Sequence, residues 1–218
     1  MDCVVIGPGL GRDSLLQECV ADIMSAARQA RIPMVIDADG LHLVSNQPHL
    51  IAGYPLAILT PNVNDLGRVT IVQKGAADGI SDGNAGTILR VSRALPLRPF
   101  AHLSNSLGSF ATPPVFECGL FGSPRRCGGQ GDVLSGSIAV FFVWARKWQQ
   151  RLQEEQQQGG GSSDAEMQQL VAEQLSDNPA VMAAFAGSLV VRRAAADAFA
   201  KHKRSMTTTN IIECLGDW

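Results

Sequence analysis

Short apolar segments that each end in glycine or polar residues are the sequence feature that most restricts the possible folds. Four of them lie in the first third of the chain, at residues 3–6, 34–36, 57–59 and 69–72. A helical pattern separates the first two, and its apolar residues recur on one face: Leu15, Leu16, Val20, Ile23 and Met24. Wholly apolar strands that alternate with helices are typical of an α/β fold. We therefore expect a largely parallel sheet flanked by helices.

Composition favours one domain and argues against two classes of partner. With 218 residues, of which 45% are hydrophobic, residues 1–218 can bury the core of a single domain. The formal net charge of −2 provides no basic field that would attract nucleic acid or an anionic membrane. The sequence has no run of about 20 apolar residues, which is the length needed to span a bilayer. We expect neither nucleic acid nor membrane as a partner.

The five cysteines are odd in number and widely spaced along the chain: Cys3, Cys19, Cys118, Cys127 and Cys214. They lack the close pairs of a zinc site or a redox dithiol, and the four histidines form no ligand pattern with them. These features predict reduced thiols and an intracellular protein, and they leave any metal ligands unassigned.

Two stretches depart from the pattern of strands and helices. Residues 85–114 contain four prolines, and a helical start at 85–95 gives way to serine and proline, so we expect an irregular, poorly ordered insertion. Residues 149–169 are rich in glutamine, glycine and serine, and they cannot bury much apolar surface. They are expected to form a surface linker between helices at 131–146 and 180–201.

The sequence GSPRRCGGQGD, from Gly122 to Asp132, carries the strongest chemical signal. It leads directly into an apolar helix, so glycine amides and a helix N-terminus would together face an anion such as phosphate. Asp132 beside a phosphate fits a base that accepts the proton of a hydroxyl as that oxygen attacks a phosphoryl group. Alternatively, Asp132 caps its helix and the glycines only form a tight turn.

Polar residues also follow the other predicted strands, and in an open parallel sheet they would gather at one edge. Asp37 and Asp39 could orient Mg²⁺-bound water or ribose hydroxyls, or could cap the next helix. Lys74 and Gly75 follow the fourth strand. The glycines of GPGLGR lack the spacing of a dinucleotide fingerprint, so a Rossmann dehydrogenase is a weaker interpretation.

Together these motifs resemble a known family. The strings VVIGPGLGRD, IPMVIDADGLHLV, LTPN, VTIVQKGAADGISDG, GSPRRCGGQGDVLSGS and KHKRSMTTTNII resemble the ATP-dependent NAD(P)H-hydrate dehydratases, which have a ribokinase-like fold. The resemblance implies that ATP phosphorylates the hydroxyl of a hydrated nicotinamide ring and that phosphate then leaves, giving ADP, phosphate and NADH or NADPH. It also implies ATP and Mg²⁺ as cofactors and functional pairing with an NAD(P)H-hydrate epimerase. A cytoplasmic or mitochondrial location and a homo-oligomer are both compatible with it.

The same resemblance assigns the site residues. Substrate-binding positions are Gly11, Asn62, Val63, Asn64, Asp65, Leu66, Gly67, Arg68 and Asp132. ATP-binding positions are Lys74, Gly75, Ala76, Ala77, Asp78, Gly122, Ser123, Pro124, Arg125, Arg126, Cys127, Gly128, Gly129, Gln130 and Gly131. Asp132 would be the catalytic base and Asp39 a further acid of the site, while Asp65 stands where the family generally has glutamate.

The chain also departs from the family pattern. Strand and helix units that precede the strand at Cys3 in the family are not found here, and Arg68 runs into Val69 without the dozen or so residues of a parallel crossover. Residues 85–95 resemble a family helix that normally precedes VTIVQKG. We therefore expect an incomplete sheet with an unpaired edge and exposed apolar faces, and hence low solubility or dependence on a partner copy.

Three functions remain open at this point. The first is the hydrate dehydratase, which is a lyase. The second is a small-molecule kinase of the same fold, in which the phosphorylated product leaves intact. The third is a catalytically inactive truncated form, which the missing units suggest.

Overall fold

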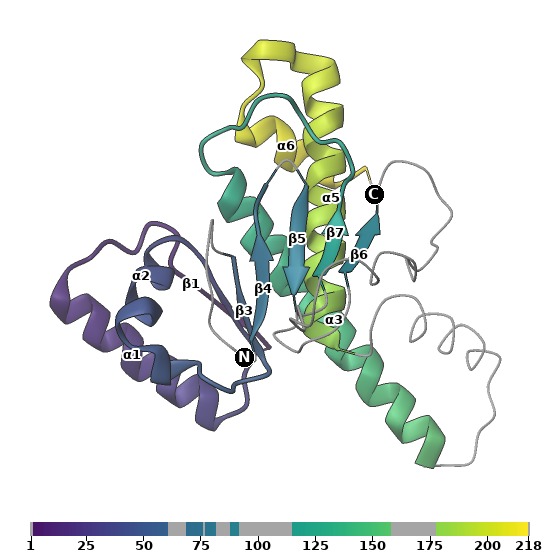
Figure 1. Cartoon of the computed structure of the whole chain (residues 1–218). Coiled ribbons are helices and arrows are strands. Elements are labelled where there is room, and N and C mark those ends of the chain that lie inside the picture. The colour runs from purple at the N-terminus through teal and green to yellow at the C-terminus, as the bar shows by residue number, and fades with distance from the viewer. Residues whose placement is uncertain are drawn as a thin grey trace, which may run out of the picture.

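A computed structural model describes residues 2–60, 69–75, 77–81, 88–91, 115–157 and 178–217. These residues form one mixed sheet with helices on both faces (Figure 1). The strands are β1 (Val4–Ile6), β2 (Met34–Ile36), β3 (Ala57–Leu59), β4 (Thr70–Gln73), β5 (Asp78–Ser81), β6 (Ile88–Val91) and β7 (Val115–Cys118). The helices are α1 (Ser14–Gln29), α2 (Ala38–Asn46), α3 (Gln130–Gln157), α5 (Pro179–His202) and α6 (Thr208–Leu215), with 3₁₀ turns η1 (Pro48–Leu50) and η2 (Lys203–Ser205).

The sheet has seven strands in the order β1-β2-β3-β4-β5-β7-β6. Strands β1 to β4 are mutually parallel and match the four predicted segments within a residue or two at each end. Strand β5 is antiparallel to both neighbours, and β6 is parallel to β7. The predicted α/β fold with a largely parallel sheet is therefore confirmed. The parallel pair β3 and β4 also forms although few residues join the two strands.

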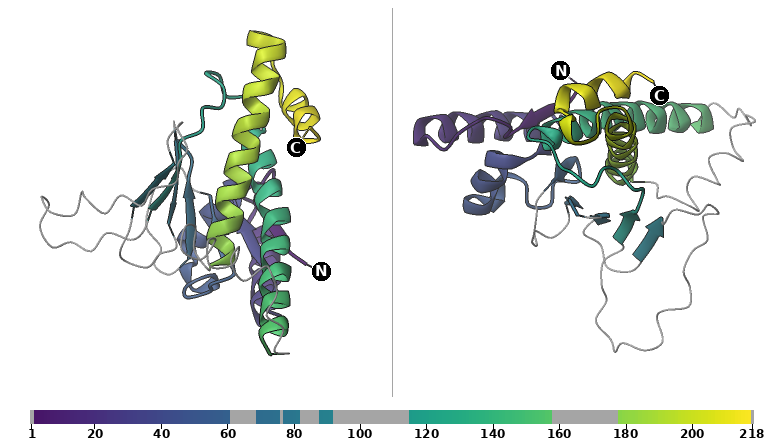
Figure 2. Two further views of the ribbon diagram at one scale, coloured as in Figure 1. Left: turned by 90° about the vertical axis from the view of Figure 1, so that its right-hand side faces the viewer. Right: turned by 90° about the horizontal axis from the view of Figure 1, so that it is seen from above.

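Alternating side chains of the parallel strands divide the core between the two faces of the sheet. Met34 and Ile36 pack with α1, α2 and η1 on one face. Val35, between them, packs on the opposite face with α3 and α5. Figure 2 shows α3 and α5 side by side on that face. This arrangement explains why the strands are apolar at every position, because both of their faces are covered.

Helices α3 and α5 approach closely where Gly187 meets Ile138. A Cβ atom on Gly187 would lie 2.6 Å from Ile138 Cγ1, so only glycine fits at this crossing. Residues Pro179–Ser205 are long and apolar enough to cross a membrane, but 56% of their most apolar stretch is buried within the fold. The core helix of a soluble protein can have the same length and composition, and α5 packs against α3 and the sheet as such a helix does.

Two expectations about irregular stretches need correction. Ile88–Val91 forms strand β6 instead of helix or irregular chain, because pairing with β7 outweighs the local helical pattern. Helix α3 continues to Gln157, past the predicted start of the linker at residue 149. The glutamine, glutamate, arginine and leucine residues at this end of α3 are good helix formers, so the helix continues beyond its apolar part. The remainder of 85–114 and residues 158–169 lie outside the described residues.

The expected sheet edge and exposed apolar face are both present in the described part of the chain. Strand β1 lies at the end of the strand order and pairs only with β2. On α1, Val20 and Met24 are buried as predicted, whereas Leu15 and Ile23 are 69% and 52% exposed. With Leu16, which is 39% exposed, three of the five residues of the predicted apolar face of α1 therefore point to solvent.

Candidate functional site

The predicted nucleotide-binding segments line one cavity of about 490 Å³. The turn between β4 and β5 contributes Lys74 and Gly75, and the first residue of β5 contributes Asp78. The loop between β7 and α3 contributes residues 121–124, 126 and 127, and α3 and α5 close the cavity. Figure 1 shows this loop, in teal, passing beyond the carboxyl end of β4. The two motifs, which are more than 40 residues apart in sequence, thus meet where an α/β sheet binds its ligands.

Lys74 is held at the edge of this cavity by Asp37. Its Nζ donates to Asp37 Oδ1 at 2.7 Å, and the carboxylate is almost fully buried. The same oxygen accepts from the Ala38 amide, so Asp37 is the N-cap of α2. A Cβ atom on Gly131 would lie 3.5 Å from both Asp37 Oδ2 and Lys74 Nζ. The ion pair therefore lies directly beside the first turn of α3.

Asp78 lines the same cavity, and its carboxylate is paired with Arg192 of α5. Its carboxylate accepts from Arg192 Nη2 at 2.6 Å, from Arg192 Nε at 2.8 Å and from the Gly75 amide at 3.0 Å. Asp78 is buried, and Arg192 is mostly so. Burial alone would lower the pKa of Arg192, but the hydrogen bonds and charge of Asp78 outweigh it and raise that pKa above its ordinary value. Asp78 is thus engaged by protein groups.

The middle of the glycine loop is anchored on two sides. Arg126 Nη2 donates to the Gly75 carbonyl at 2.9 Å, which ties the loop to the β4–β5 turn. On the other side, the Thr208 hydroxyl at the start of α6 donates to the Gly128 carbonyl, and Cys127 Sγ lies 3.2 Å from the Met206 carbonyl oxygen. Gly129 has φ +82°, a conformation that favours glycine. The TTTN segment near the C-terminus therefore supports the loop.

Asp132 lies in the first turn of α3 with an exposed side chain. Its amide donates to the Gly129 carbonyl and its own carbonyl accepts from the Ser135 hydroxyl. Within the described part of the chain, its carboxylate makes no hydrogen bond or ion pair, so it does not cap α3. This carboxylate is available to a ligand beside the glycine loop, as a general base must be.

The second predicted acid, Asp39, binds the loop that follows β1. Asp39 Oδ2 accepts from the Gly11 amide at 3.0 Å, and Oδ1 lies 3.4 Å from Arg12 Nε. Gly11 and Asp39 were assigned to the site separately, and the structure brings them together beyond the ends of β1 and β2. Of the two acids in DADG, Asp37 is the one that reaches the lysine of the cavity.

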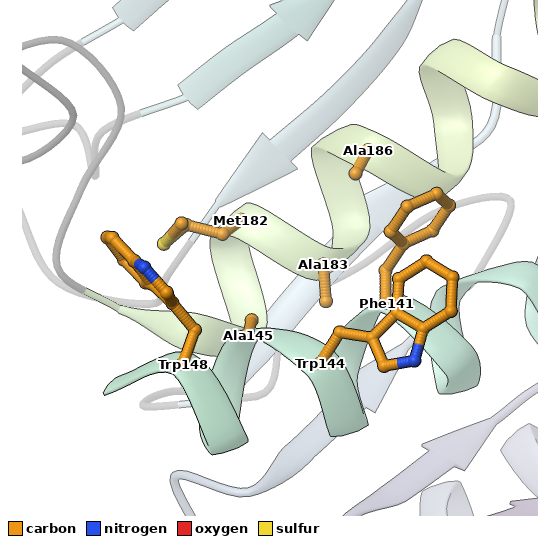
Figure 3. A pocket seen from close by; sticks show the side chains of 7 residues that line it. All are labelled: Phe141, Trp144, Ala145, Trp148, Met182, Ala183 and Ala186. Carbon is orange, nitrogen blue, oxygen red and sulfur yellow. The ribbon is translucent and has the colours of Figure 1, made fainter. Parts of the chain in front are cut away.

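A second cavity, of about 240 Å³, lies between α3 and α5 (Figure 3). Phe141, Trp144, Trp148 and Met182 line it together with alanines. The Phe141 and Trp144 rings meet edge to face at 5.5 Å. The lining supplies no charged group for a phosphate or a sugar hydroxyl, so we place the candidate site at the polar cavity.

The outcome for the predicted site residues is mixed. The cavity brings together most of Gly122–Gly131 with Lys74, Gly75 and Asp78, and Asp132 follows the loop directly. Arg125 is exposed and does not line the cavity. Ala76 and Asn62–Arg68 lie outside the described residues. Polar contributors that were not predicted include Arg192 and Ser188, which line the cavity, and Thr208, which supports the loop. Arg192 had only a weak sequence signal, as a charged residue in an alanine-rich helix.

Among the described residues, no group of three or more histidine, cysteine, aspartate or glutamate side chains could hold a metal ion. Asp37 and Asp78 near the cavity are each engaged by a cation. Mg²⁺ commonly binds through substrate phosphates with only one or two carboxylates. Asp132 is the carboxylate that fits such a site.

Comparison with known proteins places this chain in a family. The family model described as NAD(P)H-hydrate dehydratase matches residues 1–216. Proteins named ATP-dependent (S)-NAD(P)H-hydrate dehydratase align over 99% of the chain, with 42% identity in Physcomitrium patens, 44% in Arabidopsis thaliana and 39% in Homo sapiens. The chain covers 62%, 53% and 56% of those three proteins, respectively. It therefore spans between half and two thirds of their length.

Proposed function

Because this chain belongs to the NAD(P)H-hydrate dehydratase family, we propose that it catalyses the ATP-dependent dehydration of hydrated NADH and NADPH. The observation that carries this proposal is the position of Asp132. Its available carboxylate follows a glycine loop that lines a polar cavity with Lys74 and Arg126. The ribokinase-like fold of the family accounts for the loop, which belongs to phosphoryl-transfer chemistry.

In the proposed reaction, ATP occupies the cavity and the hydrated ring lies beside Asp132. The Asp132 carboxylate accepts the proton of the ring hydroxyl as that oxygen bonds to the γ-phosphorus and the bond to ADP breaks. Phosphate then leaves from the ring carbon, and the ring regains its double bond with loss of a proton. Lys74, Arg126 and the amides at the start of α3 stabilise the negative charge on the phosphates.

Mg²⁺, when bound with ATP, would neutralise phosphate charge and orient the γ-phosphoryl group. We propose Asp132 as the protein carboxylate nearest to it. We also propose an intracellular location and a functional partnership with an NAD(P)H-hydrate epimerase. Such an enzyme would convert the other epimer into the (S)-hydrate named for the relatives. The asymmetric exposure of α1 favours association with a second copy.

The test is to incubate the chain with ATP, Mg²⁺ and hydrated NADH. A dehydratase restores the absorbance of NADH and releases one phosphate for each NADH formed. A small-molecule kinase would consume ATP without releasing phosphate and would leave a phosphorylated product. The absence of ATP consumption above the level of the Asp132→Asn variant would contradict the proposal and identify an inactive form.

A further inference from the structure

Arg192 on α5 contacts two of the segments that surround the polar cavity, the β4–β5 turn and the segment between β7 and α3, and no motif pointed to it. Its guanidinium makes the paired hydrogen bonds with Asp78 described above. It also donates from Nη2 to the Gly75 carbonyl at 2.9 Å and from Nη1 to the Leu120 carbonyl at 3.1 Å. One side chain therefore joins the β4–β5 turn to the segment that leads into the glycine loop.

The backbone of α5 contacts the same region. A Cβ atom on Gly122 would lie 3.4 Å from the Arg192 carbonyl oxygen, so the beginning of the glycine loop rests directly on this turn of α5. Arg126 from the far part of the loop donates to the Gly75 carbonyl that Arg192 also contacts. The Gly75 carbonyl is thus the point at which the turn, the loop and α5 meet.

Charge balance explains why an arginine is suited to this position. The planar guanidinium matches the carboxylate of Asp78 with two parallel hydrogen bonds and still has donors for two carbonyl groups. The pair is mostly buried, so removing the cation would leave a buried carboxylate beside the place proposed for a polyphosphate. That negative charge would repel the nucleotide, and the turn that carries Lys74 would lose its anchor.

We propose that Arg192 is a positioning residue for nucleotide binding, which fixes the β4–β5 turn against the glycine loop and neutralises Asp78. This inference rests on the proposed function, because it takes the cavity to be the ATP site. Asp78 then acts through Arg192 and the Gly75 amide, without contacting ATP. Lys74 and Arg126 remain the cations that face the phosphates.

The experiment compares Arg192→Gln and Arg192→Lys with the matched control Arg193→Gln in the full chain. Arg193 is the next residue on α5, where it forms an exposed ion pair with Asp197 at 3.2 Å. Titration calorimetry with ATP should show that Arg192→Gln weakens binding roughly tenfold to a hundredfold, as expected when a displaced turn misaligns a site. Arg192→Lys should recover part of the loss, since it restores the charge without the paired hydrogen bonds. Arg193→Gln should bind as the wild type does.

A second readout separates positioning from general stability and does not need ATP. Hydrogen exchange of the nucleotide-free protein should speed up in Arg192→Gln at the Gly75 amide and at residues 119–122, with α1 and α2 unchanged. Exchange that is faster throughout the protein, or unchanged from the wild type, would overturn the proposal. Wild-type ATP affinity in a folded Arg192→Gln protein would also overturn it. If the wild type binds no ATP, the proposed function fails, and the exchange pattern alone decides the role of Arg192. If Arg192→Gln does not fold, Arg192→Lys provides the same two comparisons.

Discussion

At the residue scale, the site depends on which carboxylates are already engaged. Asp37 is neutralised by Lys74 and Asp78 by Arg192, whereas the carboxylate of Asp132 has no protein partner among the described residues. A buried carboxylate without a cation is costly, so the paired acids are structural, and the available acid is exposed where a ligand can reach it. We therefore propose that Asp132 carries the chemistry.

Asp37→Asn should lower the free energy of unfolding by roughly 1–3 kcal/mol, because it removes the charge that pairs with Lys74 while leaving an oxygen to cap α2. The matched control is Asp39→Asn, two residues along. Asp39 is more exposed and its ion pair with Arg12 is long, so this change should cost about 1 kcal/mol or less. Urea unfolding measures both values. Equal losses in the two variants would show that the Asp37–Lys74 pair stabilises the fold no more than the Asp39–Arg12 pair does.

Thiol reactivity should follow burial. Desolvation raises the pKa of Cys3 to about 11 and also raises the pKa of Cys118, whereas Cys19 is exposed. At pH 8, iodoacetamide should therefore modify Cys19 well before Cys3 or Cys118, as read by peptide mass spectrometry. The pKa of Cys3 in the folded protein exceeds the ordinary value of 9.0. The stability that depends on its protonated thiol should therefore be lost as pH rises from about 9 to 11. Rapid modification of Cys118 in the folded chain would contradict this account.

At the element scale, the parallel strands and the helices α1 and α5 were predictable because each has a complete local signal, and so was the first half of α3. Met34–Ile36 is apolar throughout and is followed by an acidic turn, and Gly122–Asp132 carries its own motif. Strand β6 was not predictable, since Ile88–Val91 becomes a strand only by pairing with β7. The role of Arg192 was hidden for the same reason. Its partners lie 114 and 72 residues away in sequence, at Asp78 and Leu120.

The α3–α5 crossing offers a matched pair of glycine substitutions. Gly187→Ala should destabilise the protein by roughly 1–3 kcal/mol, because its Cβ would overlap Ile138. Gly136→Ala on α3 adds a Cβ with no atom within 4 Å, so it should stabilise by about 1 kcal/mol or less through helix propensity. Urea midpoints test both. A stabilising Gly187→Ala would show that the two helices separate easily at this point.

At the scale of the whole molecule, the exposed side of α1 and the edge strand β1 should drive association. Replacing Leu15 and Ile23 by lysine should shift the chain toward monomer in sedimentation velocity, because both side chains expose apolar surface. Glu18→Lys on the same helix changes the net charge by the same amount without removing an apolar group, and it should leave association unchanged. A wild-type chain that is already monomeric at high concentration would contradict this expectation.

Activity also requires that the fold align the motifs of the site. The paired acids and the anchored glycine loop support this alignment. The most direct test of the central claim is the turnover of Asp132→Asn with ATP, Mg²⁺ and hydrated NADH, measured beside its affinity for ATP. We expect a loss of roughly 10²- to 10⁴-fold in kcat with ATP binding unchanged, because the base is removed while the phosphate contacts remain. Wild-type turnover in Asp132→Asn would show that Asp132 is not the base.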